Sequence, residues 1–207
     1  MRKTALERVA RRVVQILGKD DCVLVGGLAV GAHGYVRATN DVDFVARIPL
    51  AEVHKRLTAH GMAAVVKRGD VLDGDFPCVK GTLDGIRVDI MPPLVPIDWD
   101  RAIELPLTKT VALRVVDLDG LLRLKLRARG PKDLMDVAAL VLRHRGHRKR
   151  AQELATAYGV ADKLEAWLSD RRLQAEIAEL REAERGSETP ARRVKVPARR
   201  GGTERRG

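Results

Sequence analysis

The sequence has 207 residues, a length that predicts one domain, or one domain with a small helical annex. Hydrophobic residues make up 45% of the chain but aromatic residues only 3%, so the core must consist mainly of Leu, Val and Ala, and base stacking on aromatic platforms is not expected. The net charge of +11 favours a polyanionic partner, either a nucleic acid or a nucleoside triphosphate.

The cysteines and the hydropathy pattern exclude several protein classes. Cys22 and Cys78 are far apart and form no CxxC spacing, which argues against a disulfide framework or a zinc site. No apolar run approaches the roughly 18 residues that a membrane helix needs, and the N-terminus lacks the apolar segment of a signal peptide. We therefore predict a cytoplasmic, reduced protein that does not enter a membrane.

A glycine pair marks a predicted turn in the first part of the chain. Residues 3–17 carry apolar side chains at helical spacing and end before a glycine, which predicts an amphipathic helix. A short apolar run at 22–25 leads into Gly26 and Gly27, and residues 28–34 are expected to form a short buried helix. The backbone N–H groups of such a strand-to-helix turn can cradle phosphate oxygens, although an ordinary turn has the same sequence signal.

Two acids interrupt the apolar strand that comes next. The polar segment 35–40, which contains Arg37 and Thr39, is followed by Asp41 and Asp43. Side chains at positions i and i+2 of a strand share a face, so the two carboxylates converge while the intervening apolar residues face the core. Converging carboxylates repel each other, and Mg²⁺ is the cation that takes carboxylate and phosphate oxygens together. The alternative is an exposed edge strand with two solvated acids.

A third acid lies in a later strand. Residues 49–60 predict a helix, and residues 62–91 predict antiparallel strands with tight turns at 73–74 and 84–85. The last of these strands alternates between apolar and polar side chains, with Asp89 on the polar face. If this strand pairs with the earlier acidic strand, Asp89 becomes a third carboxylate at the same place; otherwise it is a solvated acid.

The rest of the chain is predicted to be mainly helical. Residues 102–116 predict one or two further strands, after which helical spacing dominates. The predicted helices cover residues 118–128, 131–145, 147–157 and 161–182.

These patterns predict an α+β fold, in which a mixed or antiparallel sheet flanked by helices is followed by a C-terminal helical segment. We expect a core at residues 1–116, a helical region at 117–182 that completes the site, and a basic disordered tail at 183–207. Residues 185–207 hold eight Lys or Arg against two Glu, which is +6 of the total +11. Such a segment is either a solvated tail or an arm that binds nucleic acid.

Three separated motifs resemble those of the DNA polymerase β-like nucleotidyltransferase superfamily, and more narrowly its AbiEii-type group, which includes type IV toxin–antitoxin nucleotidyltransferases. The group's pattern is a Gly-Gly turn, a short helix, Arg-x-Ser/Thr-x-Asp-x-Asp, a helical Lys and a Lys-Asp-x-x-Asp helix. The matching segments here are 26–27, 37–43, 125 and 132–136. The resemblance covers roughly residues 20–142.

The resemblance implies a role for each candidate residue. Asp41, Asp43 and Asp89 are expected to be catalytic and to bind two Mg²⁺ ions, with Asp89 also assisting deprotonation. Lys125 is expected to be catalytic and to contact the triphosphate, although an exposed lysine on a helix is an ordinary feature. The nucleotide-binding residues that the resemblance implies are Gly26, Gly27, Arg37, Thr39, Lys125, Asp133 and Asp136. For the last two, the alternative is a pair of acids favoured by the dipole at a helix N-terminus.

The function implied is Mg²⁺-dependent transfer of an NMP from an NTP to a hydroxyl group, with release of pyrophosphate. The acceptor is expected to be a tRNA 3′ end or another RNA, and an antitoxin protein is an expected partner. A small-molecule adenylyltransferase of the antibiotic-modifying type is the first alternative. A catalytically silent relative that binds RNA or a partner protein is the second, although a silent protein would not need three converging acids.

Overall fold

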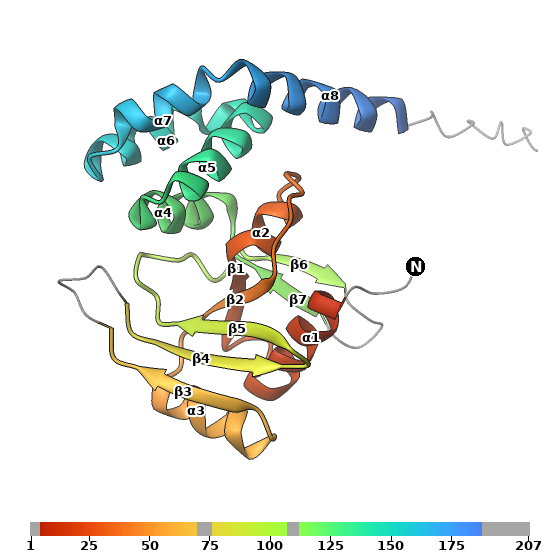
Figure 1. Cartoon of the computed structure of the whole chain (residues 1–207), viewed down its shortest axis with the longest axis vertical. Coiled ribbons are helices and arrows are strands. Elements are labelled where there is room, and N and C mark those ends of the chain that lie inside the picture. The colour runs from red at the N-terminus through yellow and green to blue at the C-terminus, as the bar shows by residue number, and fades with distance from the viewer. Residues whose placement is uncertain (1–4, 70–75, 107–111, 188–207) are drawn as a thin grey trace, which may run out of the picture.

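The computed structural model describes residues 5–69, 76–106 and 112–187. Figure 1 shows a sheet with α1 and α3 beside it, and the later helices α4 to α8 gathered at the opposite end of the molecule, beyond α2. Within the described residues, no helix is long and apolar enough to cross a membrane.

A mixed sheet forms the core, as the sequence predicted. Within the described part of the chain its seven strands run in the order β3-β4-β5-β2-β1-β7-β6. The strand β2 is central, antiparallel to β1 and parallel to β5. The strands are β1 (Cys22–Val25), β2 (Asp41–Ala46), β3 (Ala63–Lys67), β4 (Cys78–Leu83), β5 (Ile86–Met91), β6 (Ile103–Pro106) and β7 (Ala112–Val115).

The helices surround this sheet and then form a region of their own. Helix α1 packs against α3 and the sheet, while α5 packs against α4, α6, α7 and α8. The helices described are α1 (Ala5–Leu17), α2 (Gly26–Ala32), α3 (Leu50–Ala59), α4 (Leu118–Ala128), α5 (Pro131–Arg143), α6 (Arg148–Ala157), α7 (Ala161–Leu168) and α8 (Arg171–Ser187), with a short 3₁₀ helix η1 (Arg145–His147) between α5 and α6.

The core is aliphatic, as the composition required. Helix α1 buries one stripe of apolar side chains, and all four residues of β1 are buried. Phe44 is the largest side chain among the fully buried ones, and the others of this group are Leu, Ile and Val. Burying each such side chain contributes about 1.5–3 kcal/mol. The aliphatic core therefore fixes β2, and with it the positions of Asp41 and Asp43.

The hairpin between β4 and β5 forms at the predicted 84–85 turn. Asp84 and Gly85 both have positive φ, at 52° and 76°, which suits the tight turns that join antiparallel strands. The two strands pair from Leu83–Ile86 to Val79–Ile90. The other predicted turn, at 73–74, lies outside the described residues.

Three predicted boundaries were wrong. Helix α2 begins at Gly26, so the glycine pair is inside its first turn rather than ahead of it. The predicted helix 161–182 is two helices, because the Asp170 carboxylate accepts a hydrogen bond from Leu173 N at 2.8 Å and starts α8 afresh. Helix α8 also continues to Ser187, into the segment predicted as tail. The remainder of that segment, residues 188–207, lies outside the described residues.

Candidate active site

The sheet register brings the three acids of the sequence motifs to neighbouring strands. Strand β2 pairs in parallel with β5, and Asp43 is opposite Asp89. Val42 and Phe44 point into the core and are fully buried, so Asp41 and Asp43 share the opposite face. The strand that carries Asp89 therefore lies beside the acidic strand, as the role proposed for Asp89 requires.

Asp41 is held as a charged carboxylate by two donors. Thr39 Oγ1 donates a hydrogen bond to Asp41 Oδ1 at 2.6 Å, and Arg87 forms an ion pair with Asp41 Oδ2. Burial of the carboxylate would raise its pKa, but the hydrogen bonds from Thr39 and Arg87 outweigh burial and lower it. Arg87 also lies 3.5 Å from Asp89 Oδ2, so it bridges the first and third acids.

Asp43 has the opposite electrostatic environment. Burial, together with the neighbouring charges of Asp41 and Asp89, raises the pKa of Asp43 to about 7, although Lys125 and Arg87 act against this. Across the strand pair, Asp43 is opposite Val25, the residue that precedes the glycine pair. With this pKa the carboxyl is only about half ionised at neutral pH, and a bound cation would favour the charged form.

The glycine pair allows the acidic strand to approach α2. Gly26 has a φ of +64°, and a Cβ at this position would overlap the Asp43 carboxylate. A Cβ on Gly27 would stand 2.6 Å from Thr39 Oγ1. Both positions therefore exclude larger residues because the chain comes close to the acids and their supporting loop. Their predicted contact with phosphate stays a prediction.

The later helices add a lysine and two acids to the same place. Lys125 is 8% exposed and makes ion pairs with Asp133 at 2.7 Å and Asp136 at 2.9 Å. Burial would lower the pKa of Lys125, but these two carboxylates outweigh burial and raise it. The positive charge of Lys125 also acts to lower the pKa of Asp43, against the effect of burial. Helix α4 thus places a permanent positive charge between the acids of the sheet and those of α5.

Asp136 ties the loop before β2 to α5. The fully buried Asp136 carboxylate accepts two hydrogen bonds from Arg37, from Nε at 2.5 Å and from Nη2 at 2.7 Å. The hydrogen bonds to Asp136 raise the pKa of Arg37. This two-point contact is the geometry in which guanidinium and carboxylate groups bind most specifically. Asp136 is therefore a structural anchor for the loop that carries Thr39.

The oxygen atoms of these three acids are of the type that binds a hard divalent cation. Asp41, Asp43 and Asp89 offer only carboxylate oxygens, the type of ligand that Mg²⁺ prefers. Asp89 Oδ1 is buried without a hydrogen-bond partner among the described residues, which leaves it able to bind a cation. In the described ranges and in this conformation, however, no three His, Cys, Asp or Glu side chains form a group that could enclose a metal ion. In this conformation Arg87 forms ion pairs with two of the three acids, Asp41 and Asp89.

A pocket of about 210 Å³ opens beside these residues. Gly26, Asp43 and Lys125 line it together with apolar side chains of β5 and α4. Phe76 and Arg127 also line it, and the Arg127 guanidinium lies 5.2 Å from the centre of the Phe76 ring. Arg127 Nε is buried and has no hydrogen-bond partner among the described residues.

Three residues at this site, Arg87, Arg127 and Phe76, were not predicted from the sequence. Arg87 and Asp89 are two residues apart and share one face of a predicted strand. This spacing was a usable signal for an ion pair near the acids. Arg127 follows Lys125 by two positions, which on a helix gave no reason to expect it in the same pocket. Phe76 follows a segment with no regular pattern, so no sequence signal could have placed it.

Comparisons with known proteins give one family. A family model described as nucleotidyl transferase AbiEii toxin, type IV TA system, matches residues 8–206. Similar solved structures include JHP933 from Helicobacter pylori, with 10% identity, a TM-score of 0.39 and coverage of 91% of this chain and 100% of that one. Another is a tRNA-processing enzyme in an apo form, with 17% identity, a TM-score of 0.42 and coverage of 91% and 59%. No curated protein sequence matches the chain.

Proposed function

The chain belongs to the AbiEii nucleotidyltransferase toxin family, and from this premise we propose that its nucleotidyl transfer depends on Mg²⁺ and modifies a tRNA 3′ end. The observation that carries the proposal is the register that sets Asp43 opposite Asp89, beside Lys125 and the glycine pair. The net charge of +11 supports an RNA acceptor over a neutral small molecule.

In this proposal, Asp41, Asp43 and Asp89 hold the divalent cations. When bound, Mg²⁺ lowers the pKa of the acceptor hydroxyl and offsets the charge that develops on the triphosphate. The free oxygen of Asp89 supports its role as the base that takes the hydroxyl proton. The hydroxyl oxygen then bonds to the α-phosphorus, the bond from that phosphorus to the bridging oxygen breaks, and pyrophosphate leaves.

Lys125 would bind the triphosphate as a point charge. Its raised pKa keeps it protonated, and its place between Asp43 and the acids of α5 directs it toward the pocket that Gly26 also lines. Asp133 and Asp136 position the ammonium group, while Arg37 fixes the loop that carries Thr39. The glycine pair leaves room for the phosphates to approach the backbone.

The apolar part of the pocket would hold the nucleoside. The Phe76 ring, which lies against the Arg127 guanidinium, offers a planar surface beside the pocket. Stacking on this ring departs from the expectation, drawn from the low aromatic content, that aromatic side chains do not bind the base.

A transfer assay tests the proposal. The purified protein is incubated with Mg²⁺, each of the four NTPs labelled at the α-phosphate, and total tRNA. We expect labelled RNA and release of pyrophosphate, and no labelled RNA in EDTA. If label moves only to an aminoglycoside or another small hydroxyl compound, the acceptor is a small molecule and the tRNA proposal is wrong.

An antitoxin protein is the partner proposed from family membership. Coexpression of the adjacent open reading frame with a tagged copy of this chain tests the proposal. We expect the two proteins to copurify and transfer activity to fall in the complex. Transfer at an equal rate with and without the coexpressed protein would contradict it.

A further inference from the structure

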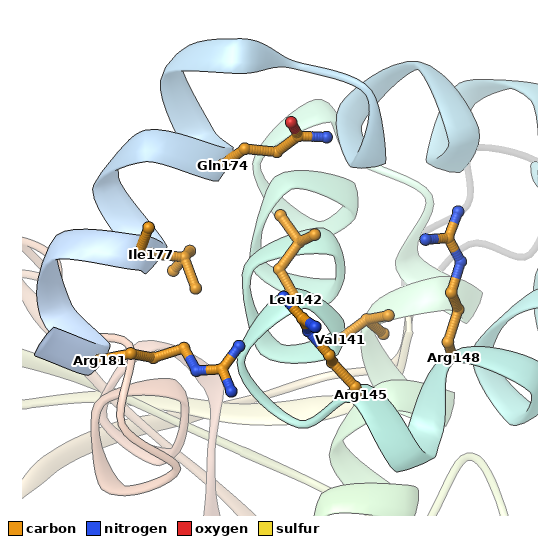
Figure 2. A pocket seen from close by; sticks show the side chains of 8 residues that line it. Val141, Leu142, Arg145, Arg148, Gln174, Ile177 and Arg181 are labelled. Carbon is orange, nitrogen blue, oxygen red and sulfur yellow. The ribbon is translucent and has the colours of Figure 1, made fainter. Parts of the chain in front are cut away.

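A pocket of about 420 Å³ lies at the far end of α5 from the candidate active site, between the start of α6 and the inner face of α8. Figure 2 shows Arg181 reaching from α8 toward the end of α5, where Arg145 lies, with Arg148 on the other side. The floor is apolar and is made by Val141, Leu142 and Ile177.

A second hollow continues the first and adds to its charge. It shares Arg181 with the first pocket and is also lined by Arg143, His144, Glu184 and Arg185. We call the two together the basic groove, lined by Arg143, Arg145, Arg148, Arg181 and Arg185 with Glu184 as the acid among them.

Two of these arginines form no ion pair within the described residues. Arg143 forms an ion pair with Glu184, and Arg148 forms one with Glu165 at 3.0 Å. Arg145 and Arg181 form no ion pair with any residue of the described ranges, and Arg145 is exposed. Unpaired guanidinium groups on the two sides of a hollow favour an anionic ligand, because no neighbouring acid neutralises their positive charges.

The groove and the candidate active site lie along one helix. Asp133 and Asp136 are in the first turns of α5, and Leu142 is in its last turn. A rise of 1.5 Å per residue puts Leu142 about 9 Å along the axis from Asp136, and about 14 Å from Asp133. This distance is short enough for one RNA strand to contact the groove and the candidate active site within a few nucleotides.

We propose that the basic groove binds the phosphodiester backbone of the RNA acceptor, a few nucleotides from the hydroxyl that reacts. The inference rests on the proposed function for the word acceptor, but the binding it describes can be measured without transfer. The arginines contact phosphates, and the apolar floor packs against a ribose or the face of a base. The continuity with the active site along α5 favours RNA over an acidic protein, which would need no connection with that site.

The test compares three double variants of the full chain with the wild type. The double variant Arg145→Gln/Arg181→Gln removes the two unpaired charges. The control Arg12→Gln/Lys55→Gln removes two charges from exposed positions of α1 and α3, which Figure 1 places at the other end of the molecule. The variant Arg145→Lys/Arg181→Lys keeps the charge. Binding of 5′-labelled total tRNA is measured by fluorescence anisotropy in EDTA without NTP, over a series of salt concentrations.

We expect the groove variant to bind tRNA about tenfold or more weakly than the control, and the Lys variant to recover most of the loss. Each lost phosphate contact reduces the slope of log K against log salt by about 0.7–0.9, so the slope should fall by about 1.5 in the groove variant only. Equal binding by the groove variant and the control would overturn the proposal, as would the absence of tRNA binding by the wild type.

Two further results separate the groove from the proposed function. If the wild type labels RNA while the groove variant binds RNA as tightly as the control, the groove proposal is wrong and the proposed function stands. If groove-dependent binding persists while no RNA is ever labelled, the groove is an RNA site and the proposed function fails.

If a polyglutamate peptide binds the wild type through Arg145 and Arg181 and RNA does not, the groove is a protein-binding surface and the proposal is overturned.

Discussion

Asp43 and Asp41 are two residues apart on one strand, yet their surroundings act on their carboxyl groups in opposite directions. Donors from Thr39 and Arg87 lower the pKa of Asp41, whereas burial and two neighbouring acids raise the pKa of Asp43 to about 7. Without a cation, the charged form of Asp43 therefore destabilises the fold. The Mg²⁺ ions proposed above would supply the missing charge.

This environment predicts how Asp43→Asn changes stability. The pKa of Asp43 rises from its ordinary 3.8 to about 7 on folding, so the folded state holds the proton more tightly and stability is lost as pH rises between these values. In EDTA at pH 8, Asp43→Asn should raise the free energy of unfolding by at least about 1 kcal/mol. At pH 4 the two proteins should be nearly equal. Urea unfolding at both pH values measures the difference; a variant less stable than the wild type at pH 8 would contradict it.

The ion pair between Arg37 and Asp136 predicts a large loss of stability when one partner is removed. Arg37→Gln leaves the fully buried Asp136 with Lys125 as its remaining cation, and breaking a buried pair in this way costs about 3–5 kcal/mol. Arg37→Lys should recover little, because an ammonium group cannot donate the same two parallel hydrogen bonds. Urea unfolding checks both variants. A loss below about 1 kcal/mol for Arg37→Gln would show that the pair is not a structural anchor.

At the scale of elements, the close packing of α2 on β2 depends on one glycine. Gly26→Ala requires a positive φ of an alanine and places its Cβ in the Asp43 carboxylate, so α2 and β2 must move apart. We expect a loss of about 2 kcal/mol or more in stability and the loss of most transfer activity. Gly31, in the same helix, is the matched control, because its added Cβ would meet no atom within 4 Å.

The control should behave in the opposite way. Gly31→Ala removes backbone freedom from the unfolded chain and should stabilise the protein by about 0.5–1 kcal/mol with activity unchanged. Thermal unfolding and the α-label transfer assay measure both variants. Equal effects of the two substitutions would mean that α2 tolerates a Cβ at position 26, and that the contact with Asp43 does not position the acid.

Much of this site could be predicted because its signals are local. Alternation put Asp41 and Asp43 on one strand face, and the same period put Asp89 on the polar face of β5, so only the pairing of the two strands was missing. The contact of Arg37 with Asp136 spans 99 positions and has no local signal. The division of α7 from α8 failed for another reason, since helical spacing continues across Asp170 and only its capping hydrogen bond separates the helices.

At the scale of the molecule, the sheet and the helical region depend on each other. The sheet supplies three acids, while α4 and α5 supply Lys125 and the acids that hold it. The same α5 leads to the basic groove, so one rigid helix sets the spacing between the proposed RNA contact and the reacting group. A chain that lost the helical region would therefore lose both the lysine and the groove, and not only a peripheral annex.

We propose that these residues perform nucleotidyl transfer, and the position of the label in the NTP tests this proposal. With tRNA and Mg²⁺, label at the α-phosphate should enter the RNA, and label at the γ-phosphate should leave as pyrophosphate. Asp43→Asn, which is expected to fold at least as stably as the wild type, should lower both rates by at least about a hundredfold. Label from the γ-phosphate in the RNA, or full activity in Asp43→Asn, would show that these residues do not transfer a nucleotide.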